Sequence, residues 1–425
     1  MALTGCMNLA LSSAARRVAW LTLSIALAAA YLYGTARACL ASRLAGSTQL
    51  ADLQRSVRLE PGNARYHALL ASHELLVEFD IPAALHQFQA ATELDPYNAG
   101  YWMALAQAHL VGGNLPAQQL AIERAVQVDP TTPDVAWEAA NFYLVRNEPD
   151  KALPRLRVVI ENQPDSVARA VKLAWRATHD VRKVMDEALP PRSDAYLALL
   201  QQMVEAREAA ASDRVWDRTY GLNQTVSPGG VFFYLQSLMD ARRVPRAQQV
   251  WRQVGERTPG FQSYQWSADN LAINGGFEYD LLNGGFDWRL QPVPFVKLAL
   301  DNLNFHHGRQ SLSVVFETYY PAQIGLLQYI PVAPSTRYTL RAFVKAEDLE
   351  SASGPRFAID DAYTKARLGI SEETVGSTPW DARSFDFTTG PDTSLVALSV
   401  VRDPADRLIR GKFWIDDVII ARKRD

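Results

Sequence analysis

The sequence predicts a multidomain protein with an N-terminal transmembrane helix, an all-α array of helical repeats and a C-terminal all-β jelly-roll sandwich. Three observations lead to this fold class. The stretch Val18–Ala36 is apolar and uncharged, and Pro61, Pro96, Pro130 and Pro164 follow one another at intervals of 34 or 35 residues. From about residue 270 the helical period gives way to short alternating runs. A fixed period of this length indicates stacked helical hairpins, since one hairpin cannot bury its apolar face alone.

These changes of pattern set the expected boundaries. We expect a short cytoplasmic N-terminus over 1–16, a transmembrane signal anchor over 17–37, helical repeats over 45–262 and a β-sandwich over 268–425.

The apolar stretch sets the compartment. At a rise of 1.5 Å per residue, Val18–Ala36 reaches about the 30 Å of a bilayer core. The triplet Ala36-Arg37-Ala38 would also suit a cleavage site, so a cleaved signal peptide is the alternative. We expect an uncleaved, single-pass anchor in a bacterial inner membrane, with the C-terminal body in the periplasm. Cys6 and Cys39 flank the stretch, so this body has no internal disulfide.

The helical period has an internal register. Leu70-Ala71 and Leu105-Ala106 lie nine and ten residues after an opening proline, where small residues let two helices approach closely. Ala84 and Ala152 stand twelve residues before a closing proline, where Gln118 departs from the pattern and is expected to be exposed. Over residues 50–165 these features resemble the tetratricopeptide repeat family. The resemblance implies a concave surface that binds a protein partner. A further unit is expected at about 228–260, whereas residues 166–227 look helical but do not fit the repeat.

The C-terminal third is rich in short alternating segments with turn residues between them, which predicts an antiparallel sandwich. Several of its segments together resemble carbohydrate-binding modules of the family 4 and family 9 type, within the galactose-binding-like superfamily. The resemblance covers about 270–422 and is carried by Asn274–Glu278, Trp288, His307–Leu312, Leu327–Val332, Tyr338–Ala346 and Phe413–Val418.

The resemblance also implies a metal site. In related modules a structural calcium ties the opening strand to the closing one, and Glu278 with Asp416 or Asp417 matches the carboxylate positions. Oxygen ligands of this kind suit calcium. The alternative is that one aspartate caps a turn while the other meets solvent.

Glycan binding requires flat aromatic faces and polar side chains. Tyr319 and Tyr320, before a proline in an expected loop, and Trp288 are the candidate rings, and Arg309 is the candidate partner for sugar hydroxyl groups. An exposed ion pair is the alternative role for Arg309. Two further rings, Tyr329 and Trp380, are expected to pack in the core.

Catalytic motifs are missing from the sequence: it contains no G-x-S-x-G, no H-E-x-x-H, no P-loop and no dinucleotide glycine fingerprint. The net charge of −3 gives no support for nucleic-acid binding. We therefore interpret the chain as a non-enzymatic, membrane-anchored periplasmic adaptor that requires no cofactor, and the calcium that the resemblance implies would be a structural ion. Its repeats would bind a protein and its sandwich a polysaccharide, in the synthesis or export of cell-surface polysaccharide or exopolysaccharide. The alternatives are a structural assembly factor whose sandwich binds no sugar and, third, a polysaccharide-modifying enzyme.

Overall fold

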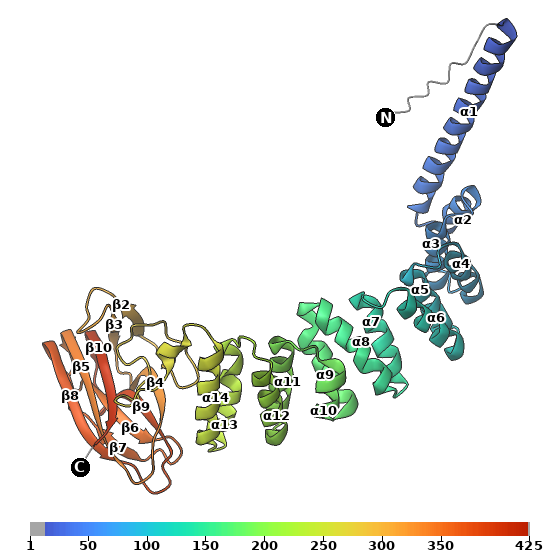
Figure 1. Ribbon diagram of the computed structural model, residues 1–425. Helices are drawn as coiled ribbons and strands as arrows, with labels where there is room; N and C mark the ends of the chain where they lie inside the picture. The colour runs from blue at the N-terminus through green and yellow to red at the C-terminus, as the bar shows by residue number, and fades with distance from the viewer. Residues whose placement is uncertain (1–12, 424–425) are drawn as a thin grey trace, which may run out of the picture. The chain divides into compact units, whose positions relative to one another are not determined.

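The computed structural model describes residues 13–423 (Figure 1). Residues 1–12, which make up most of the expected cytoplasmic N-terminus and include Cys6, lie outside the described residues. Contacts divide the chain into two compact units, Met1–Pro190 and Pro191–Asp425. This division falls inside the stretch 45–262 that the sequence assigns to repeats. The first unit is helical, and the second combines helices with the sandwich.

Antiparallel helix pairs build the first unit. Asparagine or aspartate caps several helices, as where Asn63 accepts a hydrogen bond from the Arg65 N–H at 3.1 Å and Asp80 accepts one from the Ala83 N–H at 3.1 Å. The elements are α1 (Ala14–Ala45), α2 (Leu50–Leu59), α3 (Ala64–Leu76), α4 (Ile81–Leu94), α5 (Ala99–Val111), α6 (Leu115–Val128), α7 (Pro133–Val145), α8 (Pro149–Asn162), η1 (Pro164–Ser166), α9 (Val167–Thr178), α10 (Val181–Lys183) and the π-helical turn η2 (Val184–Ala188).

Helices of the second unit continue the same pairing. They are α11 (Ser193–Glu205), α12 (Ala209–Gly221), η3 (Pro228–Val231), α13 (Phe232–Asp240), α14 (Val244–Arg257) and η4 (Phe261–Tyr264). The stretch 166–227, which the sequence left unfitted, therefore contributes hairpins of its own. The segment expected at 228–260 forms the pair α13–α14.

A left-handed residue recurs in the turn inside each hairpin after the first. Except in the turn at His179, the N–H group that follows it donates to a carbonyl five or six residues earlier, as Asn114 does to His109 at 2.9 Å, which ends the first helix of the pair. The left-handed residues are Phe79, Gly113, Asn147, His179, Arg207 and Arg242.

The small positions of the repeat lie at helix contacts. Ala84 and Ala152 are fully buried, as the register predicts. The expectation that Gln118 is exposed is wrong, because it is only 7% exposed. Gln118 occupies the same inward position as the two alanines, and its longer side chain reaches the edge of a groove between α5 and α7. The register therefore continues through this unit, with glutamine in place of alanine.

Two five-stranded antiparallel sheets form the sandwich (Figure 1). Their orders are β1-β4-β9-β6-β7 (the first sheet) and β2-β3-β10-β5-β8 (the second sheet). The strands are β1 (Arg289–Leu290), β2 (Val296–Asp301), β3 (Ser311–Tyr319), β4 (Gln323–Pro331), β5 (Arg337–Glu350), β6 (Pro355–Asp361), β7 (Arg367–Ile370), β8 (Gly376–Thr388), β9 (Leu395–Arg402) and β10 (Ile409–Arg422).

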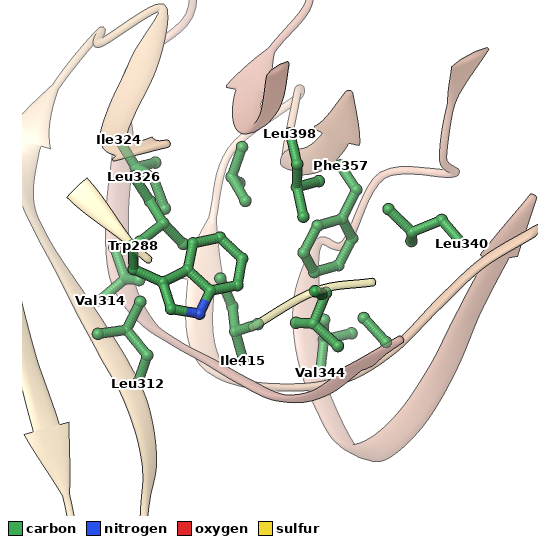
Figure 2. Packing of buried hydrophobic residues seen from close by; sticks show 14 of the residues in the cluster. Trp288, Leu312, Val314, Ile324, Leu326, Leu340, Val344, Phe357, Leu398 and Ile415 are labelled. Carbon is green, nitrogen blue, oxygen red and sulfur yellow. The ribbon is translucent and has the colours of Figure 1, made fainter. Parts of the chain in front are cut away.

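Inward-facing residues of both sheets form one core. Figure 2 shows the Trp288 ring among Val314, Leu326 and Ile415, which come from the two facing sheets. Trp288 has no exposed surface, stacks on Phe277 with ring centroids 5.2 Å apart, and donates its indole N–H to the Asn274 carbonyl at 3.0 Å. Burial of so large a ring makes this segment a principal contributor to the stability of the sandwich.

The sandwich packs directly on the last helical hairpin, inside the second unit. Trp251 of α14 is fully buried, and its ring meets Phe286 edge to face at 5.7 Å. A Cβ on Gly285 would lie 2.0 Å from the Trp251 ring, and one on Gly284 would lie 2.2 Å from Phe232. Only residues without side chains permit this approach, so the glycine pair fixes the sandwich against the hairpin.

Candidate binding sites

A groove of about 350 Å³ opens between α5, α6 and α7 of the array. Its apolar lining includes residues that remain well exposed: Val145 at 89%, Leu115 at 47% and Leu110 at 44%. Single exposed apolar residues are common, but a group that continues into a groove is typical of an interaction site. The other lining residues are Met103, Ala106, Gln107, Gln118, Ile122, Glu138, Asn141, Phe142 and Arg146.

The lining of this groove includes both ring and polar surfaces. Phe142 is buried there, with the Arg146 guanidinium 5.4 Å from the ring centroid. Arg146 also pairs with Glu148 at 3.1 Å, which holds the guanidinium in place. Together with the amides of Gln118 and Asn141, these groups provide hydrogen-bonding capacity beside apolar surface. The arrangement suits an apolar side chain that is presented on a peptide backbone.

The predicted calcium ligands lie around Gly276. A Cβ placed on Gly276 would lie 3.7 Å from Glu278 Cγ and 3.8 Å from an Oδ1 atom of both Asp416 and Asp417. Asp416 is fully buried. Burial raises the pKa of the Asp416 carboxyl, and the neighbouring Asp417 charge adds to this effect, while backbone N–H donors oppose it. The donor atoms are oxygens, as calcium requires.

In the structure the same carboxylates hold the loop that precedes β3. Asp416 Oδ2 accepts the His306 N–H at 2.8 Å, Asp417 Oδ2 meets His306 Nδ1 at 2.6 Å, and Glu278 Oε1 accepts the Arg309 N–H at 2.8 Å. Within residues 13–423 no group of three or more histidine, cysteine, aspartate or glutamate side chains is arranged to hold a metal ion. Calcium therefore stays a prediction for this cluster, and the loop is the observed partner.

The predicted glycan residues do not form one site. Trp288 is a core residue, so neither face of its ring is available to a ligand, and that assignment is corrected. The sequence shows an aromatic residue at position 288 but not whether its ring points into the core or toward solvent. The Arg309 guanidinium lies 3.4 Å from Glu278, as the ion-pair alternative expects. Arg309 precedes β3 and Tyr319 ends it, which separates them by about 30 Å at 3.3 Å per residue.

Tyr319 and Tyr320 are better placed. Their rings stack with centroids 4.5 Å apart, and Tyr320 is 54% exposed. Phe295, which the sequence did not single out, lies 4.8 Å from Tyr319 and is itself 52% exposed. Phe295 has a φ of 63° and Thr318 a φ of 45°, which are costly values for an aromatic and a β-branched residue. Strained backbone therefore supports a row of three rings, the aromatic row, in which Phe295 and Tyr320 are exposed and Tyr319 between them is half-buried.

A second aromatic group lies on the outer face of the second sheet. The His306 ring stacks 3.7 Å from Phe343, and Trp380 meets His306 at 5.9 Å. The expectation that Trp380 packs in the core is thus corrected: it is half-buried on the outside. Tyr329 is also half-buried, with Arg289 over its ring at 4.9 Å. The alternation along β5 gives Phe343 the face opposite to Ala342 and Val344, which is the signal that could have found this group.

Asp287 is a buried carboxyl that the sequence did not mark. It is fully buried between Phe286 and Trp288, accepts the Leu282 N–H at 2.7 Å through Oδ2, and has no partner for Oδ1. Burial raises its pKa to about 7, against the opposing effect of backbone N–H donors. The group therefore changes charge near neutral pH.

Comparison with known proteins gives structural neighbours only. No family profile matches the sequence, and no curated protein matches it. Similar solved structures include the xylan-binding domain CBM22-1 of Xyn10C from Paenibacillus barcinonensis, at 14% identity over 36% of this chain and 93% of that chain, with a TM-score of 0.27. They also include the MamA protein, at 17% identity over 41% and 94%, with a TM-score of 0.30. A third is YrrB, described as a TPR protein with an unusual peptide-binding site, at 14% identity over 41% and 93%, with a TM-score of 0.29.

Proposed function

We propose that the chain is a membrane-anchored periplasmic adaptor whose helical array binds an apolar segment of a partner protein. The observation that carries this proposal is the groove between α5, α6 and α7, where Leu110, Leu115 and Val145 remain exposed and the buried Phe142 is part of the lining. Covering this surface would remove apolar area from water, which contributes roughly 25 cal/mol per Å² before the costs of association. The groove amides would hold the backbone of the bound segment.

Binding of the full chain to an array of apolar and amphipathic peptides tests this proposal. Val145→Asp and Leu115→Asp place a carboxylate at the rim and should reduce binding of every positive peptide at least tenfold. Leu120→Asp is the matched control, since Leu120 is 68% exposed on α6 but does not line the groove. Equal losses in the rim and control variants, or no positive peptide at all, would rule out this groove.

The second candidate function is glycan binding by the sandwich, and the aromatic row supports it. Exposed ring faces stack against the apolar face of a pyranose, and Tyr320 and Phe295 each present such a surface. On a glycan array, Tyr320→Ala and Phe295→Ala should weaken any observed binding. Leu303→Ala is the control, because Leu303 is 85% exposed in the loop after β2. A negative array would favour the structural assembly factor instead.

Membrane anchoring and a place in polysaccharide synthesis or export belong to the same proposal. α1 is long and apolar enough to cross a membrane, and none of that stretch is buried by protein. A signal sequence would show the same features, so a reporter fused to the C-terminus and carbonate extraction of the chain are the tests. Activity of the reporter outside the cytoplasm with a soluble chain would retain export and reject the anchor.

A further inference from the structure

The helix that contains the apolar stretch is also the first helix of the array. α1 runs without a break from Ala14 to Ala45, and the apolar part that ends at Ala36 is exposed throughout. Beyond that point the helix packs against α2. Ala41 has no exposed surface, and the inward residues of α2, Leu53 and Ser56, are buried as well. Within α1, no flexible linker separates the apolar stretch from the first hairpin.

This continuity fixes how far the turns between hairpins lie from the end of the apolar stretch, measured along the axis of α1. That position along the axis is called their level. From Ala36 to Ala45 the helix advances about 13 Å, and the 10 residues of α2 run back by about 15 Å. The turn after α2 thus returns to the level where the apolar stretch ends. A groove confirms this placement, because Arg37 lines it together with both the 60–65 and the 94–95 segments.

Several residues at this level suit a membrane interface. Tyr97, in the turn between α4 and α5, is 85% exposed, and Leu94, the last residue of α4, is 44% exposed. Arg37 and Arg65 are exposed in the same groove, which the half-buried Glu60 and Asp95 also line. Tyrosine prefers the boundary between hydrocarbon and water, and arginine near the surface is attracted to anionic lipid phosphates. The opposite ends of the hairpins carry Phe79 and the groove proposed for a partner.

We propose that the turns at 60–64 and 94–98 contact the surface of the bilayer, with Arg37 and Arg65 facing lipid phosphates and Tyr97 entering the headgroup region. This inference rests on the anchoring part of the proposed function. It orients the array, since the hairpin turns near Phe79 and Val145 then point away from the membrane. The partner groove at Leu110 and Leu115 is accordingly accessible from the aqueous side.

Spin labels on the full chain test this orientation. In a variant with Cys6→Ser and Cys39→Ser, a nitroxide is attached at Tyr97→Cys or, as the control, at Phe79→Cys, which is 77% exposed at the opposite end of a hairpin. The chain is reconstituted in vesicles of phosphatidylethanolamine and phosphatidylglycerol. The label at 97 should be several-fold more accessible to oxygen, relative to a water-soluble nickel chelate, than the label at 79.

Two outcomes would overturn the inference, and they can be told apart. A chain that carbonate releases from the vesicles rejects the anchor and the inference together. A chain that stays anchored, with equal accessibility at 97 and 79, rejects only the contact between turns and bilayer. A further arm uses Arg37→Gln with Arg65→Gln, which should make the label at 97 more accessible to the chelate. Vesicles of phosphatidylcholine alone should have the same effect.

Discussion

Asp287 makes the stability of the sandwich depend on pH in an unusual direction. Its carboxyl is fully buried, one oxygen has no hydrogen-bond donor, and burial raises the pKa from 3.8 to about 7. In the unfolded chain the carboxyl ionises near its ordinary value. Between pH 4 and 7 the folded chain therefore retains a proton that the unfolded chain has released. The contribution of this group to stability falls as pH rises through that window and is constant above it.

The size of the effect follows from the two pKa values. A difference of about three units at 1.36 kcal/mol per unit gives about 4 kcal/mol between pH 4 and pH 8. Asp287→Asn removes the ionisation while its carbonyl oxygen still accepts the Leu282 N–H. The variant should thus be less stable than or similar to the natural protein at pH 4, and should gain on it by up to about 4 kcal/mol toward pH 8.

Urea unfolding of the full chain, followed by pulse hydrogen exchange in β3 and β10, measures this difference for the sandwich itself. The quantity of interest is the free energy of unfolding of the natural protein minus that of Asp287→Asn, which cancels the other titrating groups. Asp280→Asn is the control, because Asp280 is exposed in the same segment. A difference that does not change from pH 4 to pH 8 would show that Asp287 is hydrated or otherwise partnered, and would refute the reasoning.

Three further predictions concern packing and the carboxylate cluster. Gly285→Ala should lower the melting temperature of the second unit, because the new methyl group would collide with Trp251 and the backbone φ of 59° is unfavourable for alanine. Overpacking of this kind typically costs about 1–3 kcal/mol. An unchanged melting temperature would argue against the tight junction. Ala152→Leu should cost a similar amount by calorimetry, whereas Gln118→Leu should be milder because its side chain has room in the groove; equal shifts would discredit the repeat register. If calcium binds, chelator should lower the melting temperature and Glu278→Gln should abolish that response, with magnesium a poor substitute; a natural protein indifferent to chelator would reject calcium.

The repeat could be predicted from the sequence where residues typical of turns and helix ends mark the hairpins. Gly113 and Asn147 suit a left-handed position, and the junction prolines mark the helix ends. In 166–227 the left-handed positions inside the hairpins are taken by His179 and Arg207, which do not mark a turn in the sequence as Gly113 and Asn147 do. In addition, α10, which pairs with α9, is short and passes into the π-helical turn η2 before Pro190.

The aromatic sites could be predicted only where neighbours in sequence are neighbours in space. Tyr319 and Tyr320 are adjacent, but Tyr319 is half-buried at the end of β3, and only Tyr320, which follows the strand, is exposed. Phe295 lies beside them because its segment pairs with β3, where the Glu317 N–H donates to the Phe295 carbonyl at 2.9 Å. No local pattern in the sequence reveals this pairing. In the sequence, Trp288 cannot be distinguished from an exposed aromatic residue that binds a ligand, yet long-range packing places it in the core.

The central claim is that the array groove is occupied by another protein, and photo-crosslinking in the living cell tests it most directly. A photoreactive amino acid replaces Val145 at the rim or, as the control, Leu120, which is exposed outside the groove. We expect a discrete crosslinked product from position 145 that Leu115→Asp abolishes, and none from position 120. Crosslinks of equal yield at both positions, or a product at 145 that persists in Leu115→Asp, would contradict the account.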